Sequence, residues 1–267
     1  MGKSRTVRWP VILAIMGGIC GPVARAQDPL RGWKTDARTT AIDLVAVNAL
    51  GGITTFAFKN VSGKPIRGLV VSYDGIEHGT DYFDTGGALQ PDQQYMVRVG
   101  DSELVGGTLI LQLAAVVFAD GTAQGVQKTI DFMKDRHLGR TLEAERIRDT
   151  LTRYTKNNLD DSRLESLISA VGDLPKSVEQ ALDAVGGISR SGLPADYVVS
   201  DGFLAGVRGV REEAQRKLDG IRGLPLTASG QSGGTRAGGL LQLAQIYTGL
   251  SAKHRTILEV EKTGGKQ

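Results

Sequence analysis

Apolar and polar residues alternate with a period of two between residues 39 and 124, which is typical of β-strands with one buried face. Glycine, proline, asparagine and aspartate separate the alternating stretches, and these residue types favour turns. The alternating stretches cover residues 53–62, 66–73 and 94–100, and they are accompanied by a β-rich stretch at 39–50 and a long apolar stretch at 108–122. Six or seven short strands at this spacing predict an antiparallel β-sandwich that occupies residues 27–125.

The period changes after Gly125, where apolar residues recur every three or four positions and predict amphipathic helices. Two glycine-rich segments, 186–200 and 223–239, interrupt the helices and are predicted to be loops. The apolar stripes lie within residues 147–154, 164–171, 178–185, 203–221 and 240–258. The sequence therefore predicts an α+β multidomain chain, in which a β-sandwich is followed by a helical region over residues 126–267.

The β-rich part resembles a class of exported bacterial proteins that contain an immunoglobulin-like domain. The segments that carry the resemblance are FAFKNVSGKPIRGLVVSY and AVVFADGT, followed by a helix rich in acidic and basic residues. The resemblance covers roughly residues 41–148, and it implies an immunoglobulin-like β-sandwich but no particular chemistry. The chain departs from antibody domains because it lacks their cysteine pair and core tryptophan, and because Trp33 precedes the first predicted strand.

Residues 1–26 have the features of a cleavable export signal. Three basic residues precede an uncharged, mostly apolar run from Val11 to Cys20, and Ala24-Arg25-Ala26 matches a cleavage site. The apolar run is too short to cross a bilayer comfortably, so we predict no membrane span in the mature chain. The predicted protein is exported, periplasmic or extracellular, and begins at Gln27.

Removal of this leader changes both the cysteine content and the charge. Cys20 is the only cysteine, so the mature chain could form no disulfide and would depend on apolar packing. The leader carries four of the 32 basic residues and no acidic residue, so the formal net charge falls from +3 to −1. A nearly neutral chain has no overall field to attract nucleic acid, which leaves a protein of the envelope or exterior as the predicted partner.

Residues 73–87, YDGIEHGTDYFDTGG, concentrate the most candidate chemistry in the chain. Their acidic and imidazole side chains could bind calcium or another cation, although the spacing does not match an EF-hand. Three positions that need oxygen ligands hold Ile76, His78 and Thr85 instead. We predict a solvated loop, with a metal site as the alternative; its candidate ligands are Asp74, Glu77, His78, Asp81 and Asp84.

The other two histidines, His137 and His254, lie among charged residues and are predicted to be solvated positions on helices. Residues 134–156 alternate in charge, which predicts a solvated helix face with salt bridges. The sequence favours a non-enzymatic binding or structural module of the cell envelope. The alternative is a metal-dependent or other hydrolase that uses the acidic loop 74–84. Neither a catalytic residue nor a cofactor other than calcium is indicated.

Overall fold

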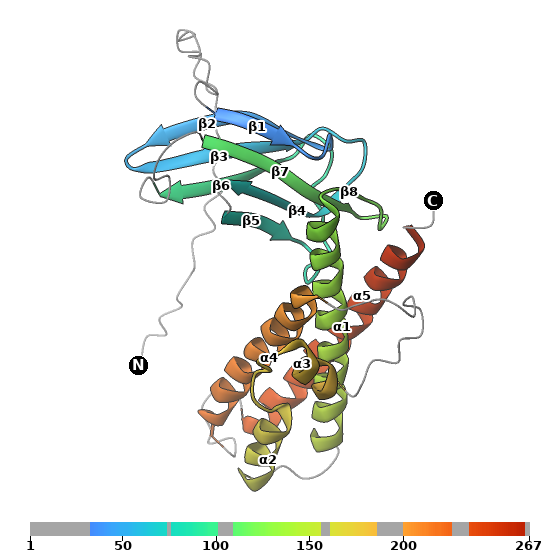
Figure 1. Cartoon of the computed structure of the whole chain (residues 1–267). Helices are drawn as coiled ribbons and strands as arrows, with labels where there is room; N and C mark the ends of the chain where they lie inside the picture. Colours follow the sequence, from blue (N-terminus) through green and yellow to red (C-terminus); the bar gives the residue numbers. More distant parts are fainter. Residues whose placement is uncertain are drawn as a thin grey trace, which may run out of the picture.

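The computed structural model describes residues 33–73, 76–100, 109–155, 161–185, 200–225 and 235–264. The predicted leader, its cleavage site and Cys20 lie outside these residues, as does most of the two predicted loops. The described part confirms a mixed architecture, with two β-sheets followed by helices (Figure 1).

The first sheet has the strand order β1-β7-β4-β5, with β8 paired to β7, and the second has the order β2-β3-β6. The strands of the first sheet are β1 (Trp33–Ala37), β4 (Ile66–Tyr73), β5 (Ile76–Asp81), β7 (Leu109–Phe118) and β8 (Ala123–Gly125). Those of the second are β2 (Ile42–Leu50), β3 (Ile53–Asn60) and β6 (Gln94–Gly100). β1 lies parallel to β7, so the prediction of a purely antiparallel arrangement is wrong at this pair. The prediction that Trp33 precedes the first strand is also wrong, because β1 begins at Trp33.

The two sheets enclose one shared apolar core, and strand alternation explains its membership. Phe56 and Phe58 point inward from β3, and Leu69 and Val71 point inward from β4. All four side chains are almost fully buried. The predicted alternation in β3, β4 and β6 is therefore confirmed for the residues that face this core. β7, predicted as a long apolar strand, is buried on both faces, because its other face joins a second apolar cluster.

The helices follow the predicted apolar stripes. They are α1 (Gln127–Thr155), α2 (Asp161–Val171), α3 (Val178–Ala184), α4 (Asp201–Arg222) and α5 (Arg236–Gly264). The stripes of α1, α2, α4 and α5 meet in one core that includes Ile147, Leu167, Val210 and Leu243. The loop prediction for 223–239 extends too far, since α5 already begins at Arg236. None of the helices within the described ranges is long and apolar enough to span a membrane.

Glycines allow α1 and α4 to approach each other closely. A Cβ atom on Gly206 would lie 2.3 Å from the backbone oxygen of Arg136, and one on Gly139 would lie 2.3 Å from that of Phe203. Such separations are impossible for a real side chain, so the two helix backbones are in direct contact there. This contact fixes the part of α1 that carries Arg136 and His137.

The charged face of α1 is not solvated as predicted. Glu143 is fully buried, and its carboxylate accepts hydrogen bonds from both Arg146 and Arg211. Arg146 also donates to the carbonyl oxygen of Val171, at the end of α2. The alternating charges therefore include a buried ion-pair network between helices, which a local sequence pattern cannot distinguish from a surface network.

Candidate functional site

The acidic segment connects the first sheet to the helices. Its first half forms β5 at one edge of the sheet, and the residues after Asp81 turn toward α1 and α5. Phe83 is fully buried, and the side chain of Asp81 is only 16% exposed. The prediction of a solvated loop is therefore wrong for these two residues, because the segment is packed against helices that lie far away in sequence.

Of the five predicted metal ligands, the three whose side chains the structure describes, His78, Asp81 and Asp84, have separate partners. Asp74 lies outside the described residues, and the side chain of Glu77 on β5 is not described. His78 lies within the sheet, where its Nε2 is 2.8 Å from the hydroxyl of Tyr73 and its ring stacks on the tyrosine. Asp81 and Asp84 instead contact the helices. Among the described residues, no three histidine, cysteine or acidic side chains are grouped so that they could hold a metal ion.

A buried histidine links the sheet to two helices. His137 on α1 lies with Nδ1 2.8 Å from Oε1 of Glu261 on α5 and with Nε2 3.1 Å from Oδ1 of Asp81. The imidazole is completely buried, and the side chain of Glu261 is 2% exposed. One imidazole therefore connects two carboxylates that lie 180 positions apart in sequence.

The two carboxylates determine the charge of His137. Burial would lower the pKa of His137, but the charge of Glu261 and the hydrogen bond to Asp81 outweigh burial and raise it to about 9. Burial would likewise raise the pKa of Asp81, but the hydrogen bond and charge of His137 lower it to about 2. At neutral pH the imidazolium donates through both ring nitrogens to two carboxylates.

The second histidine is held in a different state beside the first. Phe83 lies between the two rings, with its centroid 4.1 Å from that of His137 and 4.4 Å from that of His254. Burial, followed by the charge of Arg140, lowers the pKa of His254 to about 4. The neutral ring donates from Nε2 to Oδ1 of Asp84 at 3.0 Å, and Arg140 forms an ion pair with the same carboxylate.

We call these residues the junction cluster: Asp81, Phe83, Asp84, His137, Arg140, His254 and Glu261. The prediction that His137 and His254 are solvated is wrong, since both have no exposed surface. Their partners lie on other elements, so neighbouring charges in the sequence gave no indication of burial. The apolar Phe83 within an acidic segment was a usable signal, because an aromatic residue there favours packing against another element.

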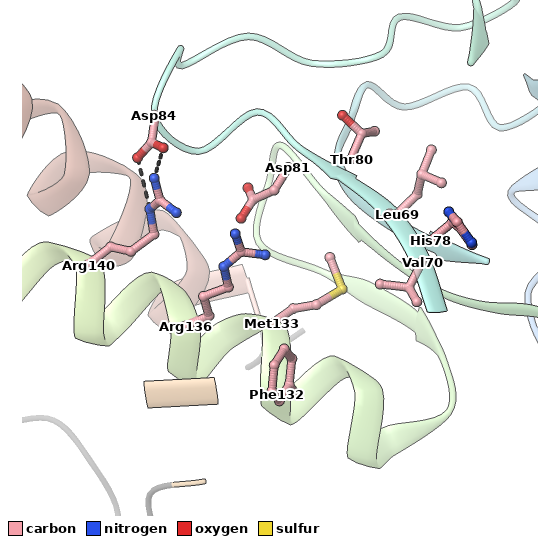
Figure 2. A pocket seen from close by; sticks show the side chains of 11 residues that line it. Leu69, Val70, His78, Thr80, Asp81, Asp84, Phe132, Met133, Arg136 and Arg140 are labelled. Carbon is pink, nitrogen blue, oxygen red and sulfur yellow. Dashed lines mark hydrogen bonds and ion pairs between the residues drawn. The ribbon is translucent and has the colours of Figure 1, made fainter. Parts of the chain in front are cut away.

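A cavity of about 340 Å³ lies beside the junction cluster, between β4, β5 and α1. Its wall includes Val70 on β4, Gly79 on β5 and Met133 on α1. Arg136 and Arg140 project from successive turns of α1 on the same side (Figure 2). The cavity combines an apolar wall with a charged rim, which is the usual character of a site that binds a small group.

Arg136 differs from the other charged residues of the rim. Asp84 is paired with Arg140, and Asp81 is paired with His137. Within the described part of the chain, the guanidinium of Arg136 makes neither a hydrogen bond nor an ion pair, and it acts on Asp81 only through its charge. It extends from α1 toward the end of β5 (Figure 2). Its donors are therefore available to a ligand, and a planar guanidinium is well suited to a carboxylate.

Comparison of the chain with protein-family models, with curated proteins and with solved structures gives no match in any of the three. The geometry described above is therefore the basis for the functional argument.

Proposed function

We propose that the protein is an exported, non-enzymatic binding module of the bacterial cell envelope, and that its partner is another protein. The observation that carries this proposal is the cavity at the junction, where Arg136 is the one charged residue of the described rim whose guanidinium makes no hydrogen bond or ion pair. The remaining charged groups of the rim are engaged in holding the sheet to the helices.

The junction cluster supports a binding role by making the protein rigid at this place. The carboxylates of β5 and the turn after it pair with α1 and α5, so the cavity walls come from elements that are fixed to one another. Preorganised walls lower the entropic cost of binding. The export part of the proposal is supported by the leader pattern in residues 1–26.

The finer fold proposal is that residues 27–125 form a variant of the immunoglobulin-like sandwich. Two sheets around one core support this proposal. The parallel β1–β7 pair distinguishes the domain from antibody domains.

The test is affinity capture from envelope extracts, with the mature chain as bait and chemical cross-linking to retain weak complexes. We expect one defined protein in an amount comparable to the bait. Sequencing of the N-terminus from an extracytoplasmic fraction should give Gln27 as the first residue. Recovery of only those proteins that an unrelated exported bait also captures would contradict the binding role, and an uncleaved cytosolic chain would contradict export.

A further inference from the structure

The cavity lies along an open edge of the first sheet. β5 is the last strand in the order β1-β7-β4-β5, so one of its sides has no neighbour among the strands that the structure describes. Strand alternation puts His78 and Thr80 on one face of β5 and Gly79 and Asp81 on the other. All four residues line the same cavity. Residues of the interior strand β4 and of α1 line the cavity as well, so it lies between α1 and the sheet and extends to the β5 edge.

The backbone at this edge is available for hydrogen bonding. In an antiparallel pair, residues that bond to the neighbouring strand alternate with residues whose N–H and C=O groups point away. Tyr82 donates its N–H to the carbonyl oxygen of Arg67 on β4, at 2.9 Å. With the observed register, Thr80 and His78 also face β4, and the peptide groups of Gly79 and Asp81 point outward. Gly79 is exposed and has no side chain to shield its backbone.

We propose that this edge binds an extended peptide segment that carries a carboxylate, either at its C-terminus or on an Asp or Glu side chain. The peptide would add a strand next to β5 and bond to the backbone of Gly79. Every second side chain would contact the apolar wall formed by Val70 and Met133. Its carboxylate would accept hydrogen bonds from the guanidinium of Arg136.

Charge complementarity selects an acidic peptide. His137 lies between Asp81 and Glu261, and Arg140 pairs with Asp84, so Arg136 is the rim cation whose guanidinium makes no hydrogen bond or ion pair in the described structure. A basic peptide would meet this guanidinium with like charge, whereas a carboxylate would supply the missing partner. This inference rests on the proposed binding function and specifies the site and the class of partner.

The experiment uses hexapeptides of alternating apolar and polar residues, each with valine, leucine or phenylalanine at the apolar positions. Each peptide is made as a C-terminal acid, as an amide without acidic residues, and as an amide with one Glu side chain. Binding is measured by amide chemical shifts of the isotope-labelled protein. We expect shifts at Gly79 and Thr80, and an affinity at least tenfold higher for a form with a carboxylate than for the neutral amide. The acid and Glu forms show which source of the carboxylate is preferred.

Two controls separate the site from general charge effects. Arg136→Gln should abolish the preference for the carboxylate, whereas Arg98→Gln, which changes an exposed arginine on β6, should preserve it. N-methylation of alternate peptide amides should abolish binding, because it removes the donors for strand pairing.

The proposal is overturned if neither carboxylate-bearing form binds more tightly than the neutral amide, by shifts centred on β2 or β6, or by no binding at millimolar peptide. A protein partner that is captured equally well by the wild-type chain and by Arg136→Gln would also overturn it, while leaving the proposed binding function intact.

Discussion

Raising the pH should destabilise the protein, because it removes one proton from the junction cluster. His137 has a folded pKa of about 9, compared with 6.5 for an unperturbed imidazole. The folded state therefore holds a proton that the unfolded state has released at any pH between these two values. A group whose pKa is raised on folding contributes its full stabilisation below pH 6.5, and the contribution is lost as the pH rises to about 9.

The structure sets the size of this effect. A tenfold change in an equilibrium corresponds to about 1.4 kcal/mol, so the interval from 6.5 to about 9 corresponds to about 3 kcal/mol of unfolding free energy. His254 gives the opposite dependence on the acidic side, because its folded pKa of about 4 lies below 6.5. Its contribution is complete above pH 6.5 and is lost as the pH falls to about 4. Stability should therefore be greatest near pH 6.5.

The assay is urea unfolding at fixed pH values from 5 to 9, with the unfolding free energy plotted against pH. His137→Gln should remove the alkaline decrease and should lower stability at pH 6.5 by about 3–5 kcal/mol, since it leaves two carboxylates without their partner. His78→Gln, on β5, is the matched control and should retain the alkaline decrease. A wild-type free energy that stays constant between pH 6.5 and 9 would refute the assignment of a charged, buried His137.

Three further outcomes follow from the packing and from the predicted metal site. Gly206→Ala should lower the free energy of unfolding, measured in urea, by about 1–3 kcal/mol, because the added methyl group separates α4 from α1. Gly220→Ala, in open space on α4, should raise it by up to about 1 kcal/mol. Equal effects of the two substitutions would contradict the direct helix contact. Glu143→Gln should cost about 3–5 kcal/mol in the same assay, because the buried Arg211 and the partly buried Arg146 lose their carboxylate. Glu165→Gln, at an exposed ion pair, should cost less than about 1 kcal/mol. EDTA should leave the melting temperature unchanged, since the described carboxylates of the predicted metal site pair with helical side chains; a decrease that calcium reverses would restore the metal hypothesis.

Local patterns in the sequence predicted most secondary structure but not the way its parts meet. The alternation in Ile66–Tyr73 was sufficient for β4, because both the core residues and the turn at Pro65 are local signals. β1 was missed because the polar Lys34-Thr35-Asp36 shows no apolar alternation, although the strand pairs with β7. The backbone hydrogen bonds of β1 come from its pairing with β7, and the local sequence of β1 contains no signal for a partner so distant in the chain.

The candidate site was less predictable than the fold. The acidic segment is conspicuous in the sequence because of its carboxylates, but the role of Asp81 depends on His137, which lies 56 residues away. No spacing rule relates these positions. The sequence does not distinguish Arg136 from the other arginines of α1. Arg136 differs from them because the nearby carboxylates of Asp81 and Asp84 already pair with other side chains.

The contact between Glu261 and His137 has a consequence for the order in which the protein folds. Their side chains are 124 residues apart, so the contact forms late by comparison with the hairpins and helical turns, each of which closes over a short loop. Until α5 packs, the side chains of His137 and Asp81, which are largely buried in the folded protein, remain in contact with water. We therefore expect the sheets and the individual helices to form first. The sheets and helices would then be joined at His137 only after α5, which carries Glu261, has packed.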